Sequence, residues 1–435
     1  MKKSRLILSS FLALGLVACS SGDTGSDTIA GTYSYQVTGY DWGAGVNKAV
    51  LALDHKLTQI DAQDLNVVET KQVTDWSDST FPVNVVDIDR TITDVYLCDA
   101  DGNKVEGDSK YVAVEMYVSP NDGSPLLYSM ATSRNTWSDP YTLAFTLSEG
   151  ATVDSLGTTV TAFTVEGAAT TYTTSASMFE EGSYETESGQ TYGYVTYEPT
   201  EKSDTLFVWL HGGGEGAIEG SDVYIPVLAN KVTALAGEEF QTAIGGAAIL
   251  APQSPTFWMD SGDGTWTGDN KTMYTESLMQ LIDNYKTEYG ATKVVVAGCS
   301  NGGFMTLDLM MNYPDYFTAG VPICEGKLDA AVTDEQIAAL KDQAMFFIYA
   351  ENDTTLDPSI YSEPTIARLK EAGATNLMVA SPDTVIDTSG TYKDADGNPY
   401  SYAGHWSWIY FDNNEAFDDT TGKDSWSWIA DQLNK

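Results

Sequence analysis

Residues 298–302 read Gly-Cys-Ser-Asn-Gly, with Ser300 at their centre. The run at 293–297 before them is short, apolar and rich in valine, which predicts a buried strand. The residues that follow, to about 311, carry apolar side chains at helical spacing. A sharp turn between a strand and a helix exposes a serine hydroxyl for attack and requires small flanking residues. A bare match to this pattern is weak, but its context favours Ser300 as a nucleophile over a structural serine.

A serine hydroxyl is a poor nucleophile at neutral pH and needs a base within hydrogen-bond reach. The chain contains three histidines, His55, His211 and His405. His405 follows the last expected strand, and the order serine, acid, histidine accompanies this type of turn. We therefore assign His405 as the base. We expect His211 to brace the glycine-rich loop in which it stands, and we interpret His55 as a surface or packing residue.

The third catalytic group is a carboxylate that holds the histidine tautomer and stabilises the charged imidazole. It is expected just beyond the apolar strand predicted at 345–349. Asp353 and Asp357 both follow that strand, and Glu351 is a weaker candidate. Asp353 is preferred because the acid needs a fixed position close to the strand end, and Asp357 stays open as an alternative.

A glycine-rich segment, His-Gly-Gly-Gly-Glu at 211–215, follows the apolar run at 206–210. Glycines let backbone N–H groups approach a developing oxyanion with no side chain in the way. Gly213 and Gly214 are both candidate donors for such an oxyanion hole, and we prefer Gly213. The second donor is expected to be the N–H of Asn301, the residue after the nucleophile.

Aromatic side chains stand near the expected cleft. Trp258 and Trp266 lie in the loop after a predicted strand at 247–250, and Trp406 follows the candidate base. Ligand pockets are mostly apolar with a few polar groups, so we predict that these tryptophans bind substrate. Packing of the loops by the same rings is the alternative.

The two halves of the chain differ in the spacing of their apolar residues. Residues 29–175 are rich in strand-forming residues and turns, which predicts an immunoglobulin-like β-sandwich. From 176 to 435 short apolar strands alternate with amphipathic helical stretches, which predicts an α/β domain whose mostly parallel sheet is covered by helices on both faces. Aspartate-rich stretches at 99–103 and 394–398 do not fit the spacing of a calcium loop and are interpreted as hairpin turns.

The composition excludes some partners. The formal charge is -40, so nothing here neutralises phosphates, and a nucleic-acid partner is not expected. Besides Cys19 the chain has three cysteines, an odd number that gives no disulfide framework. Pairing of Cys299 with Cys324 stays open if their strands are neighbours.

The N-terminus has the build of an export signal. A basic start and a short apolar run end in Leu-Val-Ala-Cys at 16–19. This resembles the bacterial lipoprotein signal, which implies removal of residues 1–18 and a lipid on Cys19. The small, polar stretch at 19–28 suits a tether. We therefore expect a protein anchored in the membrane by lipid, on the extracellular face of a bacterial cell.

The catalytic motifs together resemble the prolyl-oligopeptidase-like and polyhydroxybutyrate-depolymerase-like esterases of the α/β-hydrolase superfamily. The matching segments lie at 210–215, 251–253, 298–303, 350–353 and 404–406. A β-rich half before such a domain resembles bacterial esterases with an N-terminal immunoglobulin-like domain. The resemblance implies an α/β-hydrolase fold and hydrolysis of small acyl esters, with no metal and no organic cofactor. The segment around the acid departs from the family pattern, since Tyr-Ala stands at 349–350 where His-Gly is frequent.

These observations predict a serine carboxylesterase that acts on a small-molecule or glycan-linked ester through an acyl-enzyme. A serine peptidase is the alternative, because the same triad cleaves amides. A surface binding protein with an inactive hydrolase domain is a second alternative, against which the intact set of catalytic residues argues. A third is glycan binding through aromatic residues of the β-rich half.

Overall fold

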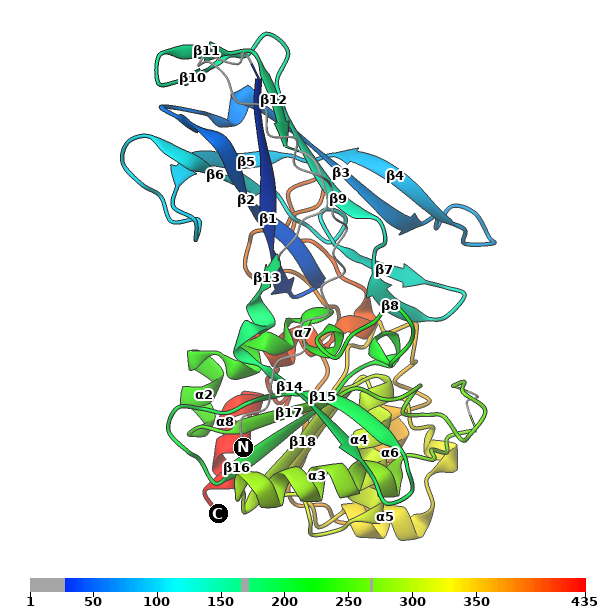
Figure 1. The fold of residues 1–435 in the computed structure, drawn as a ribbon. Coiled ribbons are helices and arrows are strands. Elements are labelled where there is room, and N and C mark those ends of the chain that lie inside the picture. The colour runs from blue at the N-terminus through cyan, green and yellow to red at the C-terminus, as the bar shows by residue number, and fades with distance from the viewer. Residues whose placement is uncertain (1–27, 166–171, 267–268) are drawn as a thin grey trace.

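The computed structural model describes residues 28–165, 172–266 and 269–435. They form an all-β domain and an α/β domain, stacked one above the other in Figure 1. The predicted signal segment, Cys19 and the tether up to residue 27 lie outside the described residues. Within the described ranges, no helix has both the length and the apolar character needed to cross a membrane.

The N-terminal domain is built on one hydrogen-bonded sheet, which among the described residues contains nine strands in the order β4-β3-β9-β12-β1-β2-β6-β5, with β13 paired to β1. The strands are β1 (Thr28–Tyr40), β2 (Gly43–Leu57), β3 (Leu65–Thr74), β4 (Val83–Asp89), β5 (Ile92–Cys98), β6 (Ser109–Met116), β9 (Tyr141–Leu147), β12 (Ala162–Val165) and β13 (Tyr172–Thr174). Two hairpins lie outside this sheet: β7 (Leu126–Ser129) with β8 (Arg134–Trp137), and β10 (Val153–Ser155) with β11 (Thr158–Val160).

This sheet has two arms, β4-β3-β9 and β12-β1-β2-β6-β5. The arms meet where β12 pairs with β9 through one residue, Val165 opposite Phe145. Apolar side chains from both arms enter one core: Leu51 and Val112 from one, Val67 and Phe145 from the other. Alternation of apolar and polar residues places one face of most strands in this core, whereas β4 and β13 have no buried residue. The predicted immunoglobulin-like domain is confirmed.

The C-terminal domain carries an eight-stranded sheet, counted over the described residues, in the order β14-β15-β17-β16-β18-β19-β20-β21. The first two strands are antiparallel to their neighbours, and the remaining pairs are parallel. The strands are β14 (Glu180–Glu185), β15 (Thr191–Tyr197), β16 (Thr205–Leu210), β17 (Ala248–Pro252), β18 (Lys293–Cys299), β19 (Ala319–Ile323), β20 (Met345–Ile348) and β21 (Leu377–Ala380).

Helices cover both faces of this sheet, as strand β16 requires, since all of its six residues are buried and five of them are apolar. Phe207 and Trp209 pack against one set of helices, and Leu206 and Val208, which point the other way, pack against the second set. The first set is α1 (Ile225–Leu228), α2 (Glu238–Ile244), α7 (Trp408–Asp412) and α8 (Ser425–Leu433). The second set is α3 (Thr275–Tyr289), α4 (Asn301–Asn312), α5 (Asp334–Leu340) and α6 (Ser362–Glu371). The predicted α/β fold with helices on both faces is confirmed.

The domains join between Thr174, where β13 ends, and Glu180, where β14 begins. The predicted division after residue 175 falls in the short 3-10 turn that connects them, Ser175–Met178. The core of the N-terminal domain continues without a break into the apolar layer of α1 and α7. At the rim of this contact, Asp41 pairs with Lys231 at 3.3 Å and accepts a hydrogen bond from Asn413 at 3.1 Å.

Candidate active site

Ser300 stands between β18 and α4 with φ 56° and ψ -113°, a left-handed region that non-glycine residues rarely occupy. The neighbouring glycines make this turn sterically possible. A Cβ on Gly302 would lie 1.9 Å from the carbonyl oxygen of Leu210, and one on Gly298 would lie 2.6 Å from the same oxygen. The strand, turn and helix therefore hold the Ser300 hydroxyl in a fixed position at the carboxyl end of the sheet.

His405 and Asp353 lie in line with this serine. His405 Nε2 is 2.9 Å from Ser300 Oγ, and His405 Nδ1 is 2.7 Å from Asp353 Oδ2. An ionised carboxylate has no proton to give, so Nδ1 must donate, which leaves the lone pair on Nε2 to accept the proton of Ser300. The other oxygen of the Asp353 side chain accepts the N–H groups of Thr355 at 2.8 Å and Leu356 at 3.0 Å.

Asp357, the alternative acid, lies on the surface. Its side chain accepts the N–H and the hydroxyl of Ser359 at 3.0 and 2.7 Å, a local turn interaction. Glu351 is also exposed. Of the three candidate carboxylates, only Asp353 is buried and hydrogen-bonded to His405.

His211 is fully buried beneath the glycine-rich loop. Its Nε2 accepts the N–H of Ser254 at 2.8 Å, and its Nδ1 lies 2.6 Å from the carbonyl oxygen of Gly212. Loss of hydration lowers the pKa of His211 to about 3, so the ring is neutral and Nδ1 donates to Gly212. His211 thus ties the loop to the segment after β17 and has no contact with Ser300 among the described hydrogen bonds. His55 lies exposed on β2, beside Asp54.

The loop that follows His211 presents its glycines in two directions. The side of Gly213 that would carry a Cβ faces Phe257 and Asn301, at 3.8 and 4.0 Å. The same side of Gly214 faces the N-terminal domain, with Asn135 at 2.9 Å and Tyr128 at 3.5 Å. Of these two candidates, Gly213 is therefore the one beside the nucleophile turn. Asn301 is the first residue of α4, and a helix leaves its first N–H groups without an intrahelical acceptor.

The three tryptophans predicted to bind substrate differ in their surroundings. Trp258 is fully buried, and its indole Nε1 donates to the carbonyl oxygen of His211 at 3.1 Å. A ring with no exposed surface does not touch a ligand, so the predicted pocket role is wrong for Trp258, which supports the glycine-rich loop from below. Trp266 is 56% exposed and stacks on Phe257 with ring centroids 6.1 Å apart.

Trp406 is half-buried and packs between Tyr402 and Trp408. Trp408 in turn meets the imidazole of His405 edge to face, with ring centroids 5.8 Å apart. The close approach of the chain here explains the preceding glycine, because a Cβ on Gly404 would lie 2.3 Å from Asn352 Oδ1. Trp408, supported by Trp406, therefore fixes the orientation of the His405 ring.

The cysteines and aspartate-rich turns take no part in this site. Cys98, Cys299 and Cys324 are buried thiols without a disulfide, and burial raises the pKa of Cys299 and of Cys324 well above its usual range. In the turn at 99–103, the Asp99 carboxylate accepts hydrogen bonds from the backbone and side chain of Asn103. The turn at 394–398 repeats this arrangement. Both are closed hairpin turns, as interpreted from the sequence.

Sequence reasoning missed the hairpin of β7 and β8. This part of the N-terminal domain lies against the catalytic loops, with Asn135 and Arg134 contacting residues 215 and 256. No local motif marks these residues, because their partners stand 80 and 122 positions further along the chain.

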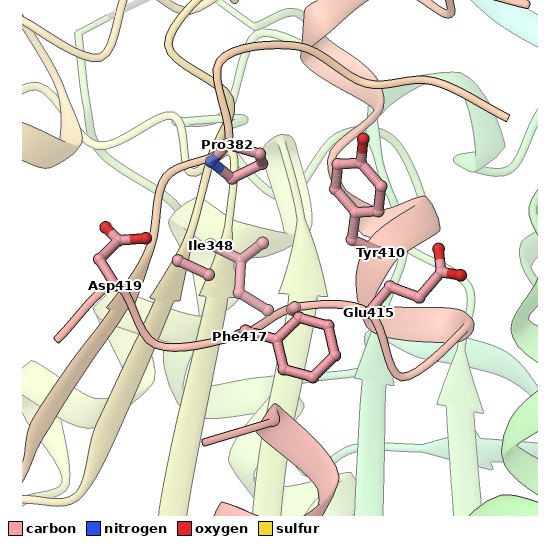
Figure 2. Close-up of a pocket in the computed structure, with 8 residues that line it drawn as sticks. Ile348, Pro382, Tyr410, Glu415, Phe417 and Asp419 are labelled. Atoms are coloured by element: carbon pink, nitrogen blue, oxygen red, sulfur yellow. The ribbon is translucent and has the colours of Figure 1, made fainter. Parts of the chain in front are cut away.

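A surface pocket of about 180 Å³ lies elsewhere, at the edge strands of the catalytic sheet. Figure 2 shows Ile348, Pro382, Tyr410 and Phe417 around it. None of the three residues of the Ser300–His405–Asp353 line belongs to its lining. The candidate active site is thus defined by its hydrogen bonds and not by this pocket.

Three comparisons with known proteins bear on the chain. Residues 33–162 match the model of the esterase Ig-like N-terminal domain. A segment of 78 residues is 33% identical to poly(3-hydroxyalkanoate) depolymerase C of Paucimonas lemoignei, and this segment spans 18% of this chain and 18% of that protein. The crystal structure of a thermostable esterase superimposes with a TM-score of 0.68, at 20% identity over 88% of this chain and 96% of that one. Residues 33–162 therefore form an immunoglobulin-like domain of the type found at the N-terminus of esterases, and most of the chain shares the fold of the superimposed esterase.

Proposed function

We propose that this chain is a serine carboxylesterase that works through an acyl-enzyme. The observation that carries the proposal is the hydrogen-bonded line from Asp353 through His405 to Ser300, with distances of 2.7 and 2.9 Å. This line supplies a nucleophile, a base and a group that orients the base, which together suffice for acyl transfer.

In the first half of the reaction, Ser300 Oγ attacks the ester carbonyl while His405 Nε2 takes the hydroxyl proton. The carbonyl oxygen becomes an oxyanion, and the N–H groups of Gly213 and Asn301 are the donors assigned to it. The carbon–oxygen bond to the alcohol then breaks, and His405 returns its proton to the leaving alkoxide. The acyl group stays on Ser300.

In the second half, water replaces the alcohol. His405 takes a proton from the water as its oxygen attacks the acyl-enzyme, and the same two N–H groups hold the second oxyanion. Ser300 leaves with the proton from His405, and the carboxylic acid is released. Every proton passes through His405 Nε2, so the Asp353 contact that fixes its tautomer matters in both halves.

Hydrolysis of p-nitrophenyl esters from acetate to octanoate tests the proposal, in the mature chain and in its Ser300→Ala variant. Activity that the variant loses, together with labelling of Ser300 by a fluorophosphonate, is the expected result. Turnover of peptide p-nitroanilides with inactivity on every ester would favour the peptidase. The absence of both turnover and labelling would favour a binding protein with an inactive hydrolase domain.

A glycan-linked ester is the proposed substrate class, because exposed aromatic rings flank the glycine-rich loop. Trp76 is 61% exposed and stacks on Tyr128, whose ring lies 3.5 Å from the position of a Cβ on Gly214. On the other side, exposed Trp266 stacks on Phe257, the neighbour of Gly213. Ring faces of this kind suit the apolar face of a sugar, and the strongly acidic chain disfavours an anionic polymer.

Acetylated xylo-oligosaccharides test this substrate class against p-nitrophenyl acetate. We expect Trp76→Ala to raise KM for the oligosaccharide several-fold and to leave KM for the small ester unchanged. Equal kinetics of wild type and variant on both esters would remove the glycan from the proposal and leave the esterase intact.

A lipid anchor at Cys19 is the proposed location signal, supported by the basic start, the apolar run and the Leu-Val-Ala-Cys end of the segment. A Cys19→Ser variant is expected to lose incorporation of a labelled fatty acid and to leave the membrane fraction. Unchanged labelling of the variant would contradict the anchor.

A further inference from the structure

Strand β8 of the immunoglobulin-like domain forms hydrogen bonds to the catalytic domain through three of its four residues. Asn135 Nδ2 donates to Glu215 Oε1 at 2.9 Å, and Arg134 Nη2 donates to the carbonyl oxygen of Thr256 at 2.7 Å. Trp137 donates through its backbone N–H to Gly220 at 3.0 Å and through its indole to Asp222. All these acceptors lie in the two loops that follow β16 and β17.

The Asn135 contact acts on the end of the oxyanion loop, residues 212–215. The side chain of Glu215 is buried and folds back on the loop, with Oε2 only 3.1 Å from the position of a Cβ on Gly212. The backbone N–H of Glu215 also turns back to the carbonyl oxygen of Gly212, at 3.5 Å. Glu215 therefore closes the loop around Gly213. Asn135 donates to its carboxyl group, and Gln253 Nε2 donates to its backbone carbonyl oxygen at 2.9 Å.

The Arg134 contact acts on the other wall of the same loop. The guanidinium carbon lies 3.2 Å from the centroid of the Phe257 ring, and Phe257 is the ring that faces Gly213. Arg134 is only 4% exposed, and within the described part of the chain its side-chain hydrogen bonds go to backbone carbonyls, not to a carboxylate. A buried guanidinium stacked on a ring fixes that ring more firmly than a flexible ammonium does.

We propose that β8 of the immunoglobulin-like domain positions the oxyanion hole, with Asn135 acting through Glu215 and Arg134 acting through Phe257. This inference rests on the proposed esterase function and adds a role for the first domain in the chemical step. Asn135 and Arg134 are positioning residues, since each reaches the reacting atoms only through a residue of the catalytic domain.

The position of Gly213 matters most in the transition state, where the carbonyl oxygen becomes an oxyanion. Loss of one oxyanion donor lowers kcat by about 10²–10³, and a displacement of about 1 Å is enough for about 10². Binding of the ground-state ester depends much less on this donor. A loosened loop should therefore lower kcat and leave KM nearly unchanged.

The test compares Asn135→Ala with Asn84→Ala in the full chain. Asn84 is an exposed asparagine on β4 of the same domain and lies outside the contacts described above. For Asn135→Ala we expect kcat on p-nitrophenyl acetate to fall about 10- to 100-fold with KM within about twofold. Affinity for a boronic acid, which forms a tetrahedral adduct on Ser300, should fall in parallel. Asn84→Ala should match the wild type in every measurement.

A double-mutant cycle with Glu215→Gln separates positioning from simple loss of stability. If Asn135 acts through Glu215, the double variant should lose little more kcat than the worse single variant. Fully additive losses would overturn the inference. If Asn135→Ala does not fold, Asn135→Asp keeps the size of the side chain and removes its donor, and it is read in the same way.

The experiments distinguish failure of the proposed esterase function from failure of the proposed role of β8. A wild-type chain with no ester turnover and no fluorophosphonate labelling refutes the esterase and the inference with it. A wild type that is active, with Asn135→Ala and Arg134→Lys both folded and within twofold of its kcat, refutes the inference alone.

Discussion

Replacement of Asp353 by asparagine should cost far more activity than the size of the change suggests. The second oxygen of the carboxylate already accepts two backbone N–H groups, from Thr355 and Leu356 at 2.8 and 3.0 Å. An asparagine will turn its only oxygen toward these donors, which places its NH₂ group toward His405 Nδ1. Nδ1 must then accept, so the proton of the neutral ring moves to Nε2.

A ring protonated at Nε2 cannot take the proton of Ser300, which lies 2.9 Å away. The wrong tautomer in a triad of this type lowers kcat by on the order of 10⁴, about 5.5 kcal/mol of transition-state stabilisation. Substrate binding does not involve this proton, so KM should change little.

The assay is steady-state hydrolysis of p-nitrophenyl acetate by Asp353→Asn, with Asp357→Asn as the matched control on an exposed carboxylate. Circular dichroism should show both variants folded. A kcat of Asp353→Asn within tenfold of the wild type would refute this reasoning. So would an Asp357→Asn variant that loses more activity than Asp353→Asn.

Three further outcomes are expected. Gly302→Ala should abolish folding or lower Tm sharply, because its Cβ would lie 1.9 Å from the Leu210 carbonyl oxygen, whereas Gly39→Ala, whose nearest atom is a side-chain hydroxyl at 3.4 Å, should keep the wild-type Tm. Trp258→Phe should lower the free energy of unfolding in urea by about 1–3 kcal/mol, since the buried carbonyl of His211 loses its donor, and a changed acyl-length preference would contradict the buried position of the ring. Burial raises the pKa of Glu215 from 4.5 to about 7, so its contribution to stability is complete below pH 4.5 and is lost as pH rises through 7. Urea unfolding at pH 5 and pH 8 should therefore show a smaller loss of stability in Glu215→Gln than in the wild type.

The residues found from sequence are those whose signal is local. Ser300 stands in a turn between a strand and a helix, and all three lie within about twenty residues. Two glycines in this segment indicate the tight turn directly. His405 was found because few histidines compete with it. In both cases the chemistry and the local geometry restrict the residue type.

The remaining parts depend on packing that no local pattern encodes. Asp353 and Asp357 stand in the same loop. The sequence favours Asp353 only for its place close to the strand end, whereas its burial and its hydrogen bond to His405 separate the two in the structure. Trp258 and Trp266 stand in one loop with opposite exposure, so composition alone could not separate a supporting ring from an exposed one. Asn135 meets Glu215 only because the sheets of the two domains pack together, and the two residues stand 80 positions apart in the sequence with no local pattern that relates them.

The uninterrupted apolar core shared by the two domains has a consequence for how the protein melts and how it can be recombined. Separating the domains would expose to water the apolar layer that joins β1 and β2 to α1 and α7, so neither domain is expected to fold by itself. Calorimetry should record a single cooperative transition, with the calorimetric and van't Hoff enthalpies in agreement. The immunoglobulin-like domain is then one half of a single folding unit. Exchange of this domain between homologous enzymes would succeed only where the apolar layer that joins the domains is exchanged with it.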